Sequence, residues 1–173
     1  VGRLVPWKGF GMLVELMPEL SKILPSAKLV IIGDGPERRQ LELRIKNYEL
    51  WDKIVLAGSM SKERVAAYLA AADVFCLNTN YEGFSHQLIE AMTIGVPVIT
   101  TDAGGNREII KDGENALVAQ YNDKEDWKEK ILCLYENKEL CSKLIKPGNE
   151  IAQRYSVEHM IYTTENLLLE ALI

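Results

Sequence analysis

The stretch from Asn80 to Pro97 reads NYEGFSHQLIEAMTIGVP and decides the fold of the chain. Four apolar residues between positions 88 and 92 are spaced for one buried helical face. Gly95, with a proline two residues later, gives the usual signal for the end of a helix. Apolar segments at 74–77 and 96–100 read as strands on either side. The stretch therefore predicts a strand–helix–strand unit, with a loop at the carboxyl end of the first strand.

That loop has the chemistry of an anion site flanked by carboxylates. Loops at the carboxyl ends of parallel strands bind ligands, and a helix N-terminus offers free N–H groups and a dipole that favours an anion. Ser85 can cap this helix. Glu82 lies before it and Glu90 within it. A carboxylate repels phosphate but accepts hydrogen bonds from hydroxyls, so the loop predicts a phosphate flanked by polyols.

The Glu82–Glu90 spacing, Glu-x7-Glu, resembles the signature of the GT4 family of retaining GT-B glycosyltransferases, also called glycosyl transferases group 1. The resemblance implies that Glu82 touches the donor sugar and that Glu90 holds the ribose. It also implies that Gly83, Phe84 and Ser85 give backbone N–H groups to the phosphates. The alternative for this stretch alone is an amphipathic helix with surface carboxylates.

A second motif lies at the start of the chain. Gly2-Arg3-Leu4 followed by Lys8-Gly9 looks like the Gly-Arg-Leu and Lys-Gly pair of GT4 enzymes. Two cations there could neutralise a diphosphate, Arg3 through a bidentate grip and Lys8 as a point charge. The resemblance implies that they stabilise the leaving group, so Arg3, Lys8 and Glu82 are the candidate catalytic residues. The alternative is that Arg3 and Lys8 are ordinary solvated basic side chains without a ligand.

Two further loops resemble the nucleotide side of such a site. The run Gly33-Asp34-Gly35-Pro36-Glu37 is a poor dinucleotide fingerprint, because Arg38 replaces the third glycine and no strand-end acid lies ~20 residues on. The same run is usual in GT4 domains near the nucleotide. By resemblance the backbone around Met60 contacts the base, and a plain surface turn is the alternative. The sequence does not distinguish uracil, guanine and adenine as the base of the nucleotide.

The loop at 102–108 resembles the family's Gly-Gly-x-x-Glu loop. Its glycines allow close approach to neighbouring backbone, and we expect Glu108 to hold the N–H groups of this loop. His86 lies in the first turn of the central helix, where the dipole disfavours protonation. The family is variable at that position, so we predict no ligand contact for His86.

Composition sets the class of protein. The chain has 173 residues, 47% hydrophobic and 26% charged, which suits one soluble α/β domain. The net charge of −5 without a basic tract argues against nucleic acid as a partner. No apolar run approaches the ~20 residues of a membrane span. Three scattered cysteines have no metal-like spacing and fit a reducing cytosol.

Strands and helices alternate along the chain, which predicts a doubly wound parallel sheet, a Rossmann-like α/β fold, without fixing the strand order. We expect a kink or a break in the first helix at Pro18 and an interruption of a late helix at Pro147-Gly148. The predicted strands are 1–4, 28–32, 54–57, 73–77, 98–101 and 116–118; the predicted helices are 10–24, 36–48, 61–71, 85–95, 107–110, 123–144, 150–154 and 157–172.

The resemblance covers nearly the whole chain and implies the C-terminal, donor-binding half of a GT-B enzyme. Residues 1–173 would be a single nucleotide-sugar-binding domain whose N-terminal acceptor domain is missing. In segment 156–173, the apolar residues Leu167, Leu168, Leu169, Leu172 and Ile173 exceed what one packing face needs, so we expect this terminal helix to pack on the missing domain. An ordinary core helix or a homodimer contact is the alternative.

The implied activity is transfer of a hexose, in the EC 2.4 class, from a nucleotide-diphosphate donor to an acceptor hydroxyl with retention. Polysaccharide, lipopolysaccharide and glycolipid synthesis all use this family. No metal is expected, and no Asp-x-Asp motif is present. We expect a cytoplasmic enzyme, with peripheral contact to the inner membrane face through the missing domain left open, and no transfer by the fragment alone. A GT-B-fold nucleotide-sugar epimerase and a noncatalytic nucleotide-sugar-binding domain are the alternatives.

Overall fold

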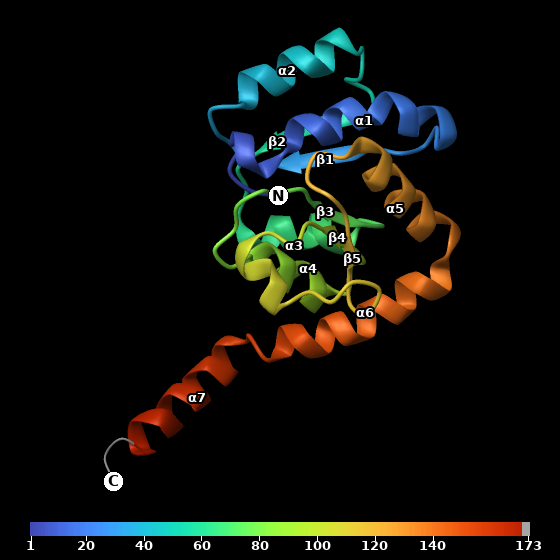
Figure 1. Ribbon diagram of the computed structural model, residues 1–173. Helices are drawn as coiled ribbons and strands as arrows, with labels where there is room; N and C mark the ends of the chain where they lie inside the picture. Colours follow the sequence, from blue (N-terminus) through green and yellow to red (C-terminus); the bar gives the residue numbers. More distant parts are fainter. Residues whose placement is uncertain (171–173) are drawn as a thin grey trace.

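The computed structural model describes residues 1–170, without the side chains of residues 157 and 158. Strands and helices alternate along it, as the sequence predicts (Figure 1). The elements are η1 (Pro6–Lys8), α1 (Phe10–Ile23), β1 (Leu29–Ile32), α2 (Arg38–Asn47), β2 (Ile54–Gly58), α3 (Lys62–Ala70), β3 (Phe75–Leu77), α4 (His86–Ile94), β4 (Val98–Thr100), η2 (Gly104–Glu108), β5 (Leu117–Val118), α5 (Lys124–Glu136), α6 (Lys138–Gln153) and α7 (Val157–Glu170).

The strands form two parallel ladders where the sequence predicts one sheet. β1 pairs with β2, and β3, β4 and β5 pair in that order. The predicted first strand, residues 1–4, is not a regular strand. Its backbone nevertheless follows β1, since the Gly2 N–H donates to the Ile32 carbonyl at 2.8 Å and the Leu4 N–H to the Asp34 carbonyl at 2.9 Å. This segment lies between the two ladders.

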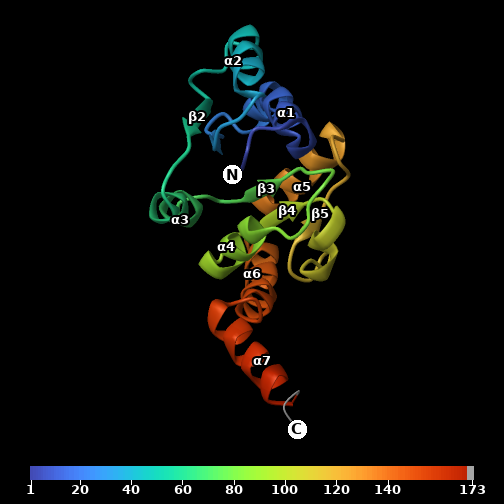
Figure 2. The same cartoon turned by 90° about the vertical axis from the view of Figure 1, so that its left-hand side faces the viewer.

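Helices cover both faces of the strands, which confirms the doubly wound architecture. Figure 2 shows α3 and α5 on opposite sides of β3. One apolar cluster joins α1, α2 and α5 to the strands and includes Leu4 and the fully buried Trp127. The other joins α3 and α4 to β3 and β4 and includes Leu88 and Met92. Both clusters bury apolar residues of the strands, so the loops at the strand ends are held by a rigid frame.

The first helix is not broken at Pro18, and the expected interruption at Pro147-Gly148 is wrong. α1 continues through Pro18, and α6 continues through Pro147 and Gly148. An internal proline removes one backbone hydrogen bond and clashes with the preceding turn, but packing on the core can offset that cost. The predicted helix 123–144 is instead divided at Asn137, whose side chain caps α6 by accepting the Leu140 N–H at 2.9 Å.

Two smaller helices also differ from the prediction. The predicted helix at 107–110 is the 3-10 helix η2, which begins at Gly104 and ends at Glu108. The predicted helix at 150–154 is the end of α6. Boundaries elsewhere agree within about two residues, the usual uncertainty of helix ends.

α7 extends away from the body of the molecule (Figure 1). Its described apolar side chains are exposed, with Leu167, Leu168 and Leu169 each at least 61% accessible. Two residues of the predicted apolar set, Leu172 and Ile173, lie outside the described residues. Within residues 1–170, no helix combines the length and the apolar character that crossing a membrane requires.

Candidate functional site

The N-terminus of α4 is built as the sequence predicts. Ser85 is the N-cap residue, and its Oγ accepts the Leu88 N–H at 3.4 Å. The helix ends at Gly95 in the left-handed conformation, with φ 88°. Ser85 is fully buried, so the loop before it is fixed to the core. The first turn of α4 therefore presents its N–H groups from a rigid position at the carboxyl edge of β3.

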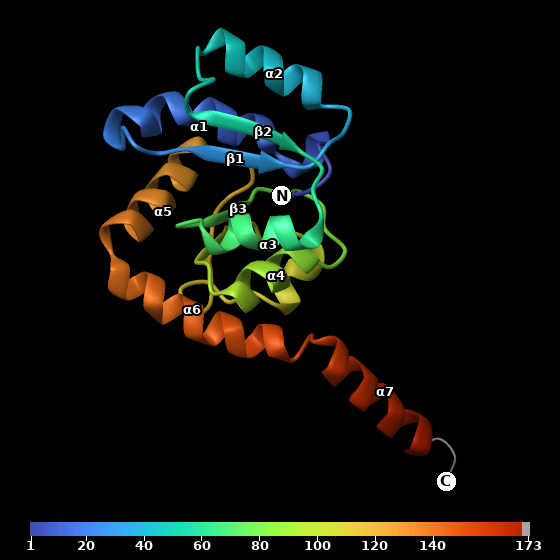
Figure 3. The same ribbon diagram turned by 180° about the vertical axis from the view of Figure 1, so that it is seen from behind.

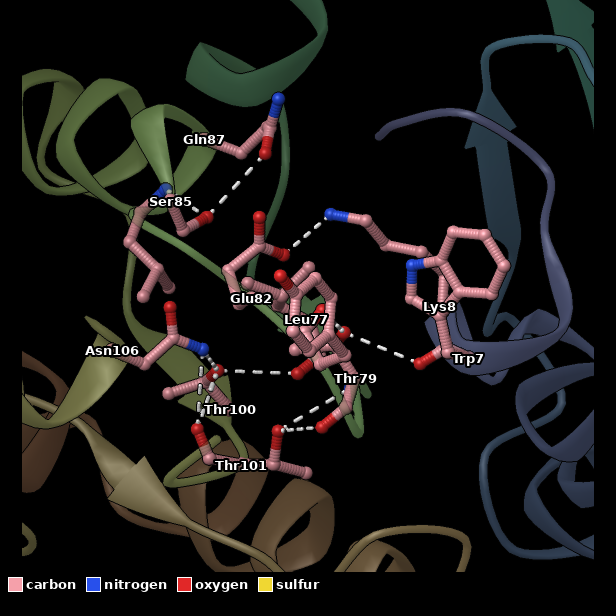
Figure 4. A network of polar contacts seen from close by, with 12 residues as sticks. Trp7, Lys8, Leu77, Thr79, Glu82, Ser85, Gln87, Thr100, Thr101 and Asn106 are labelled. Atoms are coloured by element: carbon pink, nitrogen blue, oxygen red, sulfur yellow. Dashed lines mark hydrogen bonds and ion pairs between the residues drawn. The ribbon is translucent and has the colours of Figure 1, made fainter. Parts of the chain in front are cut away.

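Lys8 and Glu82, two of the three predicted catalytic residues, meet in an ion pair at this position. The Lys8 Nζ lies 2.5 Å from a carboxylate oxygen of Glu82, although the residues are 74 positions apart. Their side chains are only 11% and 13% exposed. Figure 4 shows the two side chains pointing toward each other beside the Ser85 cap. Because water is largely excluded, this pair interacts more strongly than a surface pair.

Hydrogen bonds from the end of β3 hold Lys8 in place. The Trp7 carbonyl accepts the Asn80 N–H at 2.8 Å and the Thr79 hydroxyl at 3.2 Å. The Asn78 amide donates to the Gly9 carbonyl at 3.0 Å. Gly9 has φ 53°, and a Cβ there would lie 2.2 Å from the Asn78 Nδ2. The glycine in Lys8-Gly9 is thus what lets η1 dock directly on β3.

The glycine turn that begins η2 packs against the backbone of the Glu82 loop. The Gly105 N–H donates to the Glu82 carbonyl at 3.0 Å. A Cβ on Gly104 would lie 1.9 Å from that carbonyl oxygen, and one on Gly105 would lie 1.7 Å from the Gly83 carbonyl oxygen. The predicted close approach of this loop to neighbouring backbone is confirmed, and its target is the backbone of the Glu82 loop.

The expectation for Glu108 is wrong. Its side chain is exposed and makes no hydrogen bond within residues 1–170. Asn106 organises the loop instead, because its fully buried Nδ2 lies 3.3 Å from the Thr101 carbonyl and 3.5 Å from the Thr100 hydroxyl (Figure 4). Sequence reasoning missed Asn106, Thr100 and Thr101, since short polar residues near a glycine turn carry no distinctive spacing.

The remaining predicted loops gather at the same edge. The Gly33 N–H donates to the Gly58 carbonyl at 2.8 Å, and a Cβ on Gly35 would lie 2.5 Å from the Leu4 carbonyl oxygen. These contacts bring the loops carrying Arg3 and Met60 beside the ends of β1 and β2. Arg3 is exposed and Met60 is half-buried. Their ligand contacts, and those of the predicted phosphate-binding residues, stay predictions.

Glu90 and His86 lie on α4 itself. Glu90 is half-buried one turn after the helix begins, and His86 is exposed. The His86 ring packs edge-on against Phe84, with ring centroids 5.6 Å apart, and Phe84 also contacts Tyr155 at 5.1 Å. Packing on Phe84 is a sufficient structural role for His86. The prediction that it touches no ligand stays a prediction.

A polar pocket of about 540 Å³ lies beside the Glu82 loop, at the ends of β3, β4 and β5. None of the predicted site residues lines it; its lining includes Thr79, Asn80, Asp102, Arg107 and Tyr121. Within the described part of the chain, no group of three or more His, Cys, Asp or Glu side chains could hold a metal ion.

Known proteins resemble this chain in sequence and in structure. Residues 1–150 match the family described as glycosyl transferases group 1. An uncharacterized glycosyltransferase of Methanocaldococcus jannaschii is 33% identical over 161 residues, which cover 93% of this chain and 44% of that protein. The chain spans less than half the length of the curated relatives it matches.

Two solved structures give the comparison in three dimensions. The C-terminal domain of the group 1 glycosyl transferase LpcC from Francisella tularensis superposes with a TM-score of 0.80 and 26% identity, over 91% of this chain and 84% of that one. The pneumococcal O-GlcNAc transferase GtfA, solved with UDP and GlcNAc, superposes with a TM-score of 0.84 and 26% identity, over 98% of this chain and 34% of that one. Sequence, motifs and fold agree: this chain belongs to the glycosyl transferases group 1 family and has the fold of the C-terminal half of a GT-B glycosyltransferase.

Proposed function

We propose that this chain is the donor-binding domain of a retaining glycosyltransferase. The full-length enzyme moves a hexose from a nucleoside-diphosphate sugar to an acceptor hydroxyl. The observation that carries the proposal is the water-excluded Lys8–Glu82 pair at the N-terminus of α4. It places a cation, a carboxylate and a helix N-terminus at one point, which suits a charged diphosphate joined to a neutral sugar.

The diphosphate is held by positive charge from three sources. The N–H groups of Gly83, Phe84 and Ser85 face it from the start of α4, where the helix dipole favours an anion. Lys8 and Arg3 supply full positive charges from the N-terminal segment of the chain. When the bond to the sugar breaks, negative charge grows on the departing diphosphate, so these groups stabilise the transition state more than the bound donor.

Glu82 has two partners in turn. Without donor it neutralises Lys8, which avoids leaving a half-buried charge unpaired. With donor bound, Lys8 turns to the diphosphate and Glu82 accepts hydrogen bonds from the sugar hydroxyls. Glu90 holds the ribose hydroxyls from its place on α4, and backbone at Met60 contacts the base. No metal is needed to offset the diphosphate charge, since the cations and the helix do so.

The acceptor reaches the donor from the N-terminal domain of the longer protein. The curated relatives are more than twice as long as the matched region, which supports a second domain. Transfer needs both, so the 173-residue chain binds nucleotide but transfers nothing. Polysaccharide, lipopolysaccharide or glycolipid synthesis in the cytoplasm is the proposed setting. The solved pneumococcal relative carries UDP, which supports a nucleoside diphosphate as the ligand.

Calorimetric titration of the full-length protein with UDP, GDP and ADP tests the proposal. We expect saturable binding of one nucleotide, equal with and without magnesium, and at least tenfold weaker in Lys8→Gln. Lys128→Gln is the control, because Lys128 of α5 also forms ion pairs, with Glu19 of α1 and Glu125 of α5, but these partners are 44% and 75% exposed and lie away from the site. Equal affinity in both variants, or no binding of any nucleotide, would contradict the proposal.

A further inference from the structure

The polar pocket beside the Glu82 loop has the size of a ligand site, and the donor described above does not use it. Its volume of about 540 Å³ lies within the range of roughly 300–1,000 Å³ that is usual for small-molecule sites. Its walls come from the loops after β3, β4 and β5 and from α5. Thr79 and Asn80 line it directly before the Glu82 loop. Gly104 lines it from the other side, where a Cβ would lie 1.9 Å from the Glu82 carbonyl oxygen.

The carboxyl edge of the strands arranges the proposed donor in a line that ends at this pocket. Met60, which is proposed to contact the base, follows β2, whereas the Lys8–Glu82 pair lies at the end of β3. Figures 1 and 3 place the β1–β2 ladder on one side of β3, and Figure 1 places β4 and β5 on the other. The pocket after β4 and β5 therefore lies on the far side of Glu82 from the nucleotide, at the sugar end of the donor.

The backbone keeps the pocket close to Glu82. Two residues span at most ~7 Å, so a ligand on Asn80 lies beside a sugar that Glu82 holds. The segment between them is fixed, because the Thr79 hydroxyl donates to the Tyr81 carbonyl at 2.9 Å. Neither Lys8 nor Glu82 lines the pocket, so a ligand there leaves both side chains available to the donor.

The charged groups that line the pocket cancel one another. Asp102 and Arg107 form an ion pair at 3.4 Å. Asp126 and Lys130 form another at 3.9 Å. A phosphate, a carboxylate or a cation would be attracted by an excess of the opposite charge, which this lining does not have. A neutral polar ligand is therefore favoured.

Two side-chain amides offer hydrogen bonds to such a ligand. Asn80 and Gln120 line the pocket, and their exposed side chains form no hydrogen bond with the described residues. Each amide has two N–H donors and a carbonyl acceptor. A sugar hydroxyl both donates and accepts, so it can pair with either end of an amide. A lipid tail in this place would leave the same groups unpaired.

Tyr121 adds an aromatic ring in a fixed position. It lines the pocket, and its hydroxyl donates to the Pro6 carbonyl at 3.2 Å, which ties the ring to η1. A pyranose ring has an apolar face of C–H groups, and an aromatic ring can cover such a face. Tyr81, which lies between Asn80 and Glu82 in the sequence, is 72% exposed and adds a second aromatic ring at the same edge. Amides and aromatic rings around a neutral pocket have the chemistry of a saccharide site.

We propose that this pocket binds a neutral sugar ring of the acceptor, so that the attacking hydroxyl belongs to a saccharide. The inference rests on the proposed function, because it needs a donor sugar on Glu82. The acceptor oxygen forms the new bond to the anomeric carbon of the donor sugar while the bond from that carbon to the diphosphate breaks. The hydroxyl proton leaves with the nucleoside diphosphate. Asn80 and Tyr121 hold the acceptor ring, so the donor-binding domain takes part in choosing the acceptor.

Titration of the full-length protein with neutral sugars, followed by saturation-transfer NMR, tests the proposal. The probes are the methyl glycosides of glucose, galactose, mannose and N-acetylglucosamine. Asn80→Ala removes one amide from the pocket, and Tyr121→Leu removes its ring. Asn47→Ala and Tyr135→Leu are the matched controls, because these residues are exposed on α2 and α5 and do not line the pocket. Calorimetry with the nucleotide and with its sugar conjugate is run on every form.

We expect at least one glycoside to bind the wild-type protein and to bind each pocket variant about fivefold more weakly or worse, the effect of losing one hydrogen bond or aromatic contact. The controls should match the wild type, and all forms should keep their nucleotide affinity. Absence of glycoside binding, or equal binding by pocket and control variants, would overturn the proposal and leave the donor site standing. Loss of affinity for the nucleotide sugar, but not for the nucleotide, in the pocket variants would also overturn it, by assigning the pocket to the donor sugar.

Failure of every nucleotide to bind the wild-type protein would contradict the proposed function, and the inference would fall with it. Calorimetry separates this result from a failure of the acceptor pocket alone, because the nucleotide and the glycoside are titrated independently.

Discussion

At the scale of single residues, the Lys8–Glu82 pair combines a group that attracts the diphosphate with one that repels it. Glu82 is needed in the proposed function for the sugar, because a carboxylate accepts hydroxyl hydrogen bonds but disfavours phosphate. The Glu82 side chain is only 13% exposed, and its pairing with Lys8 lowers the cost of burying both charges before donor binds. Removing Glu82 should therefore affect mainly sugar transfer, and removing Lys8 should affect mainly nucleotide binding.

Glu82→Gln in the full-length enzyme should lower kcat by about 10²–10³, the range for loss of one transition-state contact. Nucleotide affinity should fall little or rise, because the change removes a negative charge and frees Lys8 for the diphosphate. Steady-state kinetics together with calorimetry of the matching nucleotide measure the two effects. Parallel losses of affinity and kcat would assign Glu82 to the structure of the loop rather than to the sugar.

A chain that begins at Val1 should lose stability as the pH falls from 8 to 6. Burial, aided by the nearby Lys8 charge, lowers the pKa of the Val1 amine from 8.0 to about 6 in the folded state. Between these values the unfolded chain binds more protons, so the free energy of unfolding decreases as pH falls. The full effect is about 2.7 kcal/mol for two pKa units. Urea unfolding at pH 8.5 and 6.0 measures most of it.

The same chain with an acetylated N-terminus is the control, because it lacks the amine but keeps both histidines. Its stability should change less over this interval. An identical pH dependence in the two forms would show that the Val1 amine reaches water in the folded state.

At the scale of elements, the glycine turn that begins η2 fixes the position of the Glu82 loop. Gly104→Ala should disturb it, because the Cβ would meet the Glu82 carbonyl oxygen at 1.9 Å. Gly113→Ala is the matched control, since Gly113 also has a positive φ, +70° against +52°, but has nothing within 4 Å of a Cβ. We expect Gly113→Ala to lower stability by about 1 kcal/mol through backbone strain, and Gly104→Ala to lower it by more because of the added clash. Only Gly104→Ala should also weaken nucleotide binding, by tenfold or more.

Thermal unfolding and nucleotide titration of the two variants separate these effects. If Gly113→Ala weakened binding as much as Gly104→Ala, general destabilisation would explain the loss. If neither did, the Glu82 loop would hold its position without support from this glycine.

How far the sequence predicts an element depends on how local its cause is. The ends of α4 follow from Ser85 and Gly95, whose capping acts within a few residues, and both were predicted. The path of α6 through Pro147 depends on packing against other helices, which local signals do not contain. In the site, Lys8 and Glu82 were predicted by their motifs, while the polar network of Asn106 with Thr100 and Thr101 was missed because it joins loops through tertiary contacts.

At the scale of the whole molecule, the described domain differs between its body and its last helix in how well apolar residues are covered. The helices from α1 to α6 cover apolar clusters, whereas α7 projects from the body with its apolar side chains exposed (Figure 1). Met160, Ile161 and Tyr162 are 47–64% accessible, and three successive leucines at 167–169 are at least 61% accessible. An apolar surface of this kind marks an interaction site. Because the curated relatives are more than twice as long as the matched region, the N-terminal domain of the same polypeptide is the proposed partner.

Replacing Leu168 and Leu169 with glutamate in the full-length enzyme should therefore lower transfer without weakening nucleotide binding. Burying a leucine is worth about 1.5–3 kcal/mol, so two charged substitutions should strongly disfavour docking of α7 on the other domain. The donor site should keep its affinity, because Lys8, Glu82 and the start of α4 lie in the body of the domain. Thr163→Glu with Thr164→Glu is the control, since these threonines add the same charge on the same helix but remove no apolar contact. Kinetics and calorimetry of both double variants decide the matter: equal loss of transfer would point to helix charge alone, and unchanged transfer in the leucine variant would show that α7 packs elsewhere.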